Sequence, residues 1–233
     1  IIIILRIFRN KEDKKRFIEK FSISSRKRNK GNLIWFHGAS VGEILSIIPL
    51  IKNYEKKKSI SQILVTSSTL SSSKVLKKFN FKKTIHQFYP IDHVYFTSKF
   101  LKYWNPNLAI FIDSEIWPCM FKQLDKRKIP LVLLNARLTK NTFNRWMRVK
   151  NFTKSVFKKI TIAYPQNFET KTFLKKINVN KVKLIGNLKF AENSEEKLNK
   201  INKNLKLQLK TKKVWIASST HANEEVFCAE AHI

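Results

Sequence analysis

The stretch LIWFHGASVGEILSIIPLI (residues 33–51) contains the pattern that decides the fold of this chain. Its first part, 33–38, is a short apolar run typical of a strand that is buried on both faces. A turn of small residues follows, and a broad apolar face at helical spacing begins near Gly42. A strand that leads through a short turn into a helix is the repeating unit of parallel α/β sheets. Glu43 lies at this junction, in a chain with 47 Lys and Arg against 16 Asp and Glu.

The same alternation continues along most of the chain. The expected strands are 33–38, 62–68, 86–90, 107–113, 130–136, 160–165 and 182–186. The expected helices begin near 42 and then cover 74–79 (with Ser71 to Ser73 as a cap region), 93–104, 115–127, 141–158 and 167–176. Apolar strands separated by helices predict an α/β fold with a doubly wound parallel sheet that helices cover on both faces.

The two ends of the chain differ from this pattern. Residues 192–212 are polar and rich in lysine, with apolar residues at helical spacing, which predicts a linker helix. The segment 214–220 then reads as a new strand and the last residues as a new helix. The expected divisions are 1–15 as a basic lead segment, 16–191 as the first α/β domain, 192–212 as the linker and 213–233 as the beginning of a second, Rossmann-like domain.

The apolar run at residues 1–5 is followed by basic residues. Spanning a bilayer takes about 20 apolar residues, so this run is too short to do so. Two interpretations stay open. The run is the end of a longer membrane anchor with its basic side in the cytoplasm, or it is a frayed first helix.

The formal net charge of +31 favours an anionic partner, such as nucleic acid, anionic lipid or a phosphorylated substrate. The basic residues are 38 lysines and 9 arginines. Arginine is the residue suited to bidentate recognition of phosphates and bases, so the lysine excess weakens the case for nucleic acid. A basic nucleic-acid-binding α/β module is therefore the alternative function, motivated by charge alone. Cys119 and Cys228 have no spacing typical of a metal site, and no metal or cofactor is expected.

Polar residues gather just after the predicted strands. Ligands of parallel sheets bind at the carboxyl ends of the strands, so residues in these positions are site candidates. The candidates are Ser40, Gly42, Glu43, Ser68, Thr69, Asp92, Glu115, Asn135, Arg137, Asn187 and Lys189. His37 also follows the first strand, although a histidine there is more often structural.

Each candidate also has a structural interpretation. Ser40 and Glu43 have the spacing of a capping box, and Glu115 has the position of a first-turn acid that favours the helix dipole. Lys189 fits a solvated surface charge. Neither common glycine-rich phosphate loop is present, and the serine-rich stretch near 66–73 lacks the glycines of a nucleophile elbow.

Seven motifs in order carry a family resemblance: IWFHGASVGE, SSTLSS, YPID, SEIWP, LLNARL, GNLKF and WIASSTHANEE. In this order and spacing they resemble the Kdo transferases of glycosyltransferase family 30, from about Arg16 to the last residue. The resemblance implies a two-domain GT-B-type fold and an inverting transfer of 3-deoxy-D-manno-octulosonic acid (Kdo) from CMP-Kdo to a lipid A precursor, in lipopolysaccharide biosynthesis.

The resemblance also implies roles for particular residues. Glu43 matches the general base, while Glu115 and Lys189 match positions that stabilise the transition state. Ser219, Thr220 and His221 match the opening of the donor domain and are candidates to border the cleft. Ala222 and Asn223 depart from the family's usual acidic and glycine residues after STH. The family's CMP-binding loops lie beyond residue 233, so this chain alone is expected to be inactive or nearly so.

The resemblance further implies an amino-terminal anchor at the cytoplasmic face of a bacterial inner membrane. The basic segment 141–158 alternates Trp, Met and Phe with Arg and Lys, a pattern suited to an anionic membrane surface. It equally suits a helix that packs an apolar face on the sheet and solvates a basic one. The expected partners are CMP-Kdo, the lipid A precursor and an anionic membrane surface, with no nucleic acid.

Overall fold

The computed structural model describes residues 6, 12–188, 203–210, 218, 220 and 223–231. The chain divides into two units, 1–192 and 193–233. The division of the chain into the four predicted segments remains a prediction.

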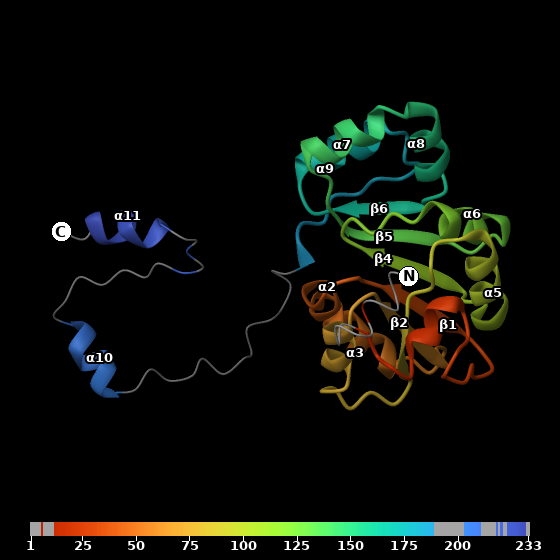
Figure 1. The fold of residues 1–233 in the computed structure, drawn as a ribbon, viewed down its shortest axis with the longest axis horizontal. Coiled ribbons are helices and arrows are strands. Elements are labelled where there is room, and N and C mark those ends of the chain that lie inside the picture. Colours follow the sequence, from red (N-terminus) through yellow and green to blue (C-terminus); the bar gives the residue numbers. More distant parts are fainter. Residues whose placement is uncertain are drawn as a thin grey trace. The chain divides into compact units, whose positions relative to one another are not determined.

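The first unit is built on a six-stranded parallel sheet (Figure 1). Its strands are β1 (Leu33–His37), β2 (Gln62–Ser67), β3 (Thr84–Phe88), β4 (Leu108–Ile112), β5 (Leu131–Ala136) and β6 (Ile162–Pro165). They lie in the order β3-β2-β1-β4-β5-β6. The chain winds outward from β1 to one edge and then returns to pair β4 with the other side of β1. The doubly wound α/β prediction is confirmed, and its switch point lies between β1 and β4.

The strands are apolar because both faces of the sheet are covered. Alternate residues of β1 enter two separate cores: Leu33 and Trp35 pack on one face, Ile34 and Phe36 on the other. The first core includes residues of α5 (Val94–Trp104), α6 (Pro118–Lys126), α8 (Lys150–Phe157) and α9 (Phe168–Lys176). The second includes residues of α2 (Val41–Ser46), α3 (Ile48–Lys56) and α4 (Leu70–Leu76). The remaining elements of this unit are η1 (Phe17–Phe21) and α7 (Lys140–Met147).

Side-chain caps place several of these helices directly after their strands. Ser40, Thr69, Thr139 and Asn167 each accept a hydrogen bond from the backbone N–H three residues later. This is the usual N-cap arrangement, which satisfies an otherwise unpaired helix N–H. Helix α6 begins instead with Pro118, whose missing N–H costs nothing at a first helical position.

Several predicted elements were wrong in detail. Residues 182–186 form no strand: only Val182 makes a bridge, to Ala163, and Gly186 has a left-handed φ of 89°. The serines 71–73 lie inside α4, because Thr69 caps that helix.

Two predicted helices are each divided in two. The helix beginning near 42 breaks at Ile47, where α3 starts with proline in its first turn. The helix 141–158 is split into α7 and α8 near Val149. At that break the Thr153 hydroxyl donates to the Trp146 carbonyl at 2.6 Å, which satisfies a carbonyl near the end of α7.

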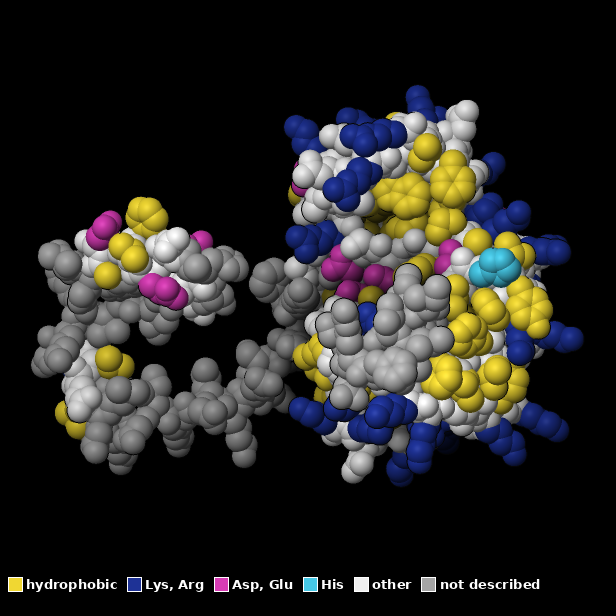
Figure 2. All heavy atoms as spheres, viewed as in Figure 1, with side chains coloured by type: hydrophobic (Ala, Val, Ile, Leu, Met, Phe, Trp, Pro, Cys, Tyr) yellow, Lys and Arg dark blue, Asp and Glu magenta, His cyan; other side chains and the backbone are white. Residues whose placement is uncertain are grey.

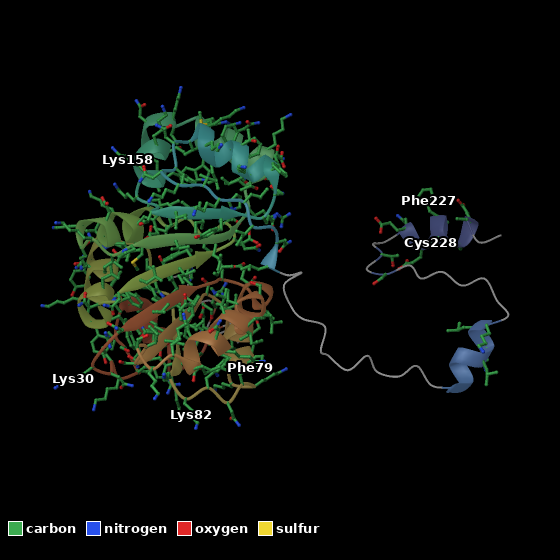
Figure 3. The ribbon with its side chains drawn as sticks, turned by 180° about the vertical axis from the view of Figure 1, so that it is seen from behind. Lys30, Phe79, Lys82, Lys158, Phe227 and Cys228 are labelled. Atoms are coloured by element: carbon green, nitrogen blue, oxygen red, sulfur yellow. The ribbon has the colours of Figure 1, made fainter. Side chains whose placement is uncertain are left out.

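The described residues of the second unit include α10 (Lys203–Lys210) and α11 (Glu224–Glu230), the helix that carries the labelled Phe227 and Cys228 in Figure 3. Most of the predicted strand 214–220 and much of the predicted linker helix 192–212 lie outside the described residues. Among the described helices, none combines the length and apolar character that crossing a membrane requires.

Candidate active site

The candidate site lies at the carboxyl ends of β1 and β4, the two strands that flank the switch point. Figure 2 shows acidic side chains gathered near the middle of the visible face of the first unit, while lysines and arginines occupy its margins. Figure 3 shows Lys30, Lys82 and Lys158 pointing outward from different parts of that unit. On this face, therefore, the basic side chains are spread out and several acids lie close together.

Glu43 is held by the turn that joins β1 to α2. Its Oε1 accepts a hydrogen bond from the Ser40 hydroxyl at 2.7 Å, and its Oε2 accepts one from the Ala39 N–H at 2.8 Å. The Glu43 N–H donates in return to the Ser40 Oγ at 3.3 Å. Ser40 is therefore the N-cap of α2, and the Glu43 side chain returns to the Ala39 N–H, one residue before the position that a strict capping box uses. Each carboxylate oxygen still has room for a further hydrogen bond, because it accepts only one from the described residues.

Gly38 allows this close arrangement. A Cβ added at Gly38 would lie 3.1 Å from the Glu43 Cβ and 3.5 Å from its Oε2. A Cβ at Gly42 would meet nothing within 4 Å, so the first turn of α2 is open on that side. The two glycines therefore have different surroundings: Gly38 makes space for the Glu43 side chain, and Gly42 borders open space.

The environment of Glu43 raises the pKa of its carboxyl group. Burial is the largest cause, and the negative charges of Glu115 and Asp113 act in the same direction. The hydrogen bonds from Ser40 and Ala39 oppose this change without cancelling it. Glu43 is therefore a stronger base than a solvated glutamate.

Glu115 follows β4 after a tight turn in which Asp113 has a left-handed φ of 59°. Its Oε2 accepts two hydrogen bonds, from the Trp117 Nε1 at 2.8 Å and from the His37 Nε2 at 3.0 Å. The His37 Nδ1 lies 3.0 Å from the Thr66 Oγ1. A chain of polar contacts thus runs from β2 through the end of β1 to Glu115.

This network lowers the pKa of Glu115. Burial is the largest single influence and acts to raise it, but the hydrogen bond and charge of His37 and the hydrogen bond of Trp117 together outweigh burial. The site therefore holds two interacting carboxyl groups whose pKa values move in opposite directions. Environments that separate the pKa values of two neighbouring acids are a common feature of acid–base sites.

Other predicted residues support the frame of the site. Thr69 caps α4, and the neighbouring Ser72 donates to the Ala39 carbonyl at 3.2 Å, which ties α4 to the turn that carries Glu43. Ser68 lies between β2 and this cap, partly exposed. The Asn135 side chain, at the end of β5, accepts from the Leu188 N–H at 3.0 Å. It therefore holds the 186–188 segment, which includes Asn187, near the carboxyl ends of the strands.

Two predicted residues have other surroundings. Asp92 accepts hydrogen bonds from the N–H groups of Cys119 and Met120, at 3.0 and 2.8 Å, so it serves the start of α6. Burial raises the pKa of Asp92. Arg137 is exposed, and its N–H contacts the Asp113 carbonyl at 3.4 Å.

Three predicted residues, Lys189, Ser219 and His221, lie outside the described residues. Thr220 belongs to the second unit, where its hydroxyl donates to Glu225 at 3.0 Å. Within the described part of the chain, no group of three His, Cys, Asp or Glu residues is arranged to hold a metal ion.

The surroundings of Glu115 contain residues that the sequence did not identify as functional. His37 was treated as structural, and Tyr89 and Trp117 were seen only within the YPID and SEIWP motifs. Tyr89 stacks on His37 with ring centres 3.9 Å apart, and Trp117 packs on Tyr89 at 5.0 Å. The aromatic content of the two motifs was the available signal.

Comparison with known proteins identifies a family. A family model described as "3-Deoxy-D-manno-octulosonic-acid transferase (kdotransferase)" matches residues 15–192. The 3-deoxy-D-manno-octulosonic acid transferase of Rickettsia bellii is 34% identical over 97% of this chain and 54% of its own length. The corresponding protein of Haemophilus influenzae is 29% identical over 85% of this chain and 47% of its own. The chain spans about half the length of the curated relatives it matches.

A solved structure supports the fold. The UDP-GlcNAc 2-epimerase from Neisseria meningitidis, bound to UDP-GlcNAc, matches with a TM-score of 0.50 at 14% identity, over 67% of this chain and 47% of the other. This likeness extends to the fold alone, and it agrees with the GT-B-type α/β architecture predicted from the sequence. Since the family model covers most of the first unit, the chain belongs to the 3-deoxy-D-manno-octulosonic-acid transferase (kdotransferase) family.

Proposed function

We propose that this chain forms the acceptor side of an inverting glycosyltransferase that moves Kdo from CMP-Kdo to a lipid A precursor. The observation that carries the proposal is the pair of carboxyl groups at the switch point, with the pKa of Glu43 raised and that of Glu115 lowered, in a member of this family. A glycosyl transfer with inversion needs one base on the acceptor side and a stabilised positive charge at the sugar.

Glu43 supplies the base. The acceptor hydroxyl attacks the anomeric carbon of Kdo and gives its proton to the Glu43 carboxylate as the new C–O bond forms. The bond from that carbon to the phosphate oxygen breaks, and CMP leaves with the electron pair. The raised pKa brings Glu43 closer to the working pH, where proton acceptance is most effective. The two hydrogen bonds from Ser40 and Ala39 hold the carboxylate in one position.

Glu115 has the complementary task. Because its pKa is lowered, it stays ionised while positive charge develops on the sugar ring. Its negative charge also raises the pKa of Glu43, so the two acids act as a coupled pair. Lys189 is proposed to meet the charge on the departing phosphate, as the family resemblance implies.

The donor site is proposed to lie in the sequence by which the relatives exceed this chain, since the chain spans about half of their length. No cofactor is included in the proposal, and CMP-Kdo is a substrate. On this view the 233 residues alone bind acceptor and transfer little or no Kdo.

We also propose that the protein works at the cytoplasmic face of the inner membrane, where its acceptor lies. Helices α7 and α8 support this location. Val149 and Phe152 are more than half exposed, and basic residues adjoin them on both helices. Apolar side chains bordered by Lys and Arg suit an anionic lipid surface.

A chimaera tests the function. Residues 1–233 replace the matched part of the Rickettsia bellii relative, and the purified protein is incubated with CMP-Kdo and a lipid A precursor in detergent micelles. Mass spectrometry should detect an acceptor that carries one or more Kdo units, together with released CMP. Omitting the acceptor controls for hydrolysis of CMP-Kdo. A folded chimaera that transfers nothing, while the relative is active under the same conditions, would contradict the proposal.

A further inference from the structure

His37 is fully buried at the carboxyl end of β1, and its ring is fixed from several sides. Tyr89 stacks on one face, with ring centres 3.9 Å apart and planes inclined by 25°. Phe111, its neighbour in β4, packs edge-on at 5.0 Å. This packing leaves each ring nitrogen facing one partner residue: Glu115 at Nε2 and Thr66 at Nδ1.

The two partners differ in what they can offer. An ionised carboxylate only accepts hydrogen bonds, so Nε2 must carry a hydrogen to bond Glu115. Thr66 presents both a hydroxyl, at 3.0 Å from Nδ1, and its carbonyl oxygen, at 3.2 Å. The hydroxyl can donate to an unprotonated Nδ1, and the carbonyl can accept from a protonated one. The bond from Nε2–H to Glu115 therefore survives in both charge states of the ring.

The register of the sheet produces this arrangement. His37 pairs with Thr66 in β2, so both side chains point to the same face. The Thr66 hydroxyl is itself held by the Trp35 Nε1 at 2.9 Å. Thr66, which has both a donor and an acceptor, thus lies next to the His37 Nδ1, which accepts a hydrogen bond when unprotonated and donates one when protonated.

The consequence appears at Glu115. His37 and Trp117 both donate to its Oε2, and the described residues place no hydrogen bond on its Oε1. The Glu115 side chain is 17% exposed, so this oxygen belongs to a partly open carboxylate whose orientation is fixed through the other oxygen. One oxygen is thus anchored by two donors, and among the described residues the other has none.

We propose that His37 is a positioning residue that keeps its Nε2–H on Glu115 at every working pH, with Thr66 satisfying Nδ1 in either charge state, so that Glu115 presents Oε1 to the substrate. The geometry of His37 and Glu115 does not depend on the proposed function. Only the benefit of this geometry to catalysis rests on the proposed function. Among the described residues, the other titratable groups near the pair are Glu43 from α2, Asp113 at the end of β4, and Tyr89 after β3 with Asp92 and Cys119 beside it.

The first test uses the wild-type chain. Histidine labelled with 15N and 13C is followed by long-range NMR between about pH 5 and pH 8, the range in which imidazoles change charge. The His37 Nε2 should remain protonated throughout. A His37 Nε2 that is unprotonated anywhere in this range would overturn the proposal, because it would then accept from Glu115. This measurement requires no transferase activity.

The second test uses two substitutions of similar size. The Gln side chain in His37→Gln extends its amide to about the position of Nε2, and the shorter side chain in His37→Asn reaches only that of Nδ1. The Glu115 carboxyl titration, read by 13C NMR, should move to higher pH in His37→Asn and less in His37→Gln. The control is His86→Asn, at a second buried histidine that bonds Ser67 and Arg16 instead. It should leave the Glu115 titration unchanged, and equal shifts in all three variants would reduce His37 to a packing residue.

The chimaera supplies the functional reading. His37→Asn should lower kcat about 100-fold with KM little changed, because a displaced carboxylate weakens the transition state more than substrate binding. His37→Gln should recover a large part of this loss. An inactive wild-type chimaera would count against the proposed function alone, since the two NMR readings are independent of it. An active chimaera with equal rates in both variants would refute the positioning role.

Discussion

The hydroxyl of Tyr89 is the most direct place to test the packing around the site. Tyr89 is buried between Trp35, His37 and Trp117, and the described residues offer its hydroxyl no hydrogen-bond partner. Burial, followed by the negative charges of Asp92 and Glu115, raises the pKa of this phenol well above its ordinary value, so the group is neutral at pH 7. Burying a neutral hydroxyl without a partner costs about 1–3 kcal/mol.

Tyr89→Phe removes that cost and keeps the ring that stacks on His37. Deleting one oxygen leaves a small space that offsets part of the gain, so we expect a net stabilisation of about 1 kcal/mol. For a chain of this length that corresponds to a rise in Tm of about 2–4 °C. Urea denaturation at pH 7, followed by circular dichroism, measures the difference in the free energy of unfolding.

Tyr103→Phe is the matched control. The Tyr103 hydroxyl donates to the Arg26 carbonyl at 2.7 Å, so its removal should lower stability by about 0.5–1 kcal/mol. The two substitutions delete the same atom and are expected to have opposite signs. If Tyr89→Phe destabilised the protein by 1 kcal/mol or more, the hydroxyl would have a partner, and this account of the packing would be refuted.

Two further predictions concern Gly38 and His86. Gly38→Ala should lower the free energy of unfolding by about 1 kcal/mol, because its Cβ would press on Glu43 at 3.1 Å; Gly42→Ala, with nothing within 4 Å, should be neutral or stabilising. The urea midpoints of the two variants measure these effects, and equal changes would contradict the claim that Gly38 makes space for the Glu43 side chain. For His86, burial and then the charges of Arg16, Arg26 and Lys77 lower its pKa from 6.5 to about 3. The unfolded chain therefore binds a proton at higher pH than the folded one, so the stability present above pH 6.5 is lost as pH falls toward about 3. Unfolding measured at pH 7 and again at a lower pH should show this loss, and His86→Gln should reduce it; an unchanged pH dependence would show that other groups cause it.

The sheet was predictable because its strands are buried on both faces. Runs such as 33–36 and 108–112 are apolar throughout, and that pattern indicates helices on both sides of the sheet. The order of the strands in the sheet was not predictable in the same way, because an apolar run does not indicate which strands it pairs with. The segment 182–186 shows the limit: it has Lys183 among its apolar residues and ends at Gly186, and it contributes only a single bridge at the sheet edge.

The two acids of the site were predictable from their positions after strands and from the family resemblance. Ser40 caps α2 as its spacing from Glu43 predicts, and the Glu43 side chain bonds the Ala39 N–H in place of the Ser40 N–H of a strict capping box. The structural and functional interpretations therefore describe the same atoms. A cap that fixes a carboxylate at a helix start is also a way to hold a base in place.

The role of His37 could not be read from the sequence. Its contact with Glu115 joins residues 78 positions apart, and it depends on the return of β4 to the side of β1. The partner at its other nitrogen, Thr66, is set by the β1–β2 register. Both conditions are properties of the folded sheet, and neither leaves a local pattern in the chain.

The measurement closest to the central claim compares Kdo transfer by the chimaera with and without Glu43→Gln. Glutamine can still accept the hydrogen bond from the Ala39 N–H, so the turn should stay folded while the base is lost. We expect kcat to fall about 100-fold or more, with acceptor binding preserved.

Two controls separate catalysis from structure. Ser40→Ala removes the cap and keeps the Glu43 carboxylate. It should lower the free energy of unfolding by about 1 kcal/mol and reduce kcat much less than Glu43→Gln does. Glu55→Gln changes a carboxylate that bonds the backbone at Lys82 and Lys83, and it should leave transfer unchanged. Transfer by Glu43→Gln at nearly the wild-type rate would contradict the account and leave Glu43 as a helix cap.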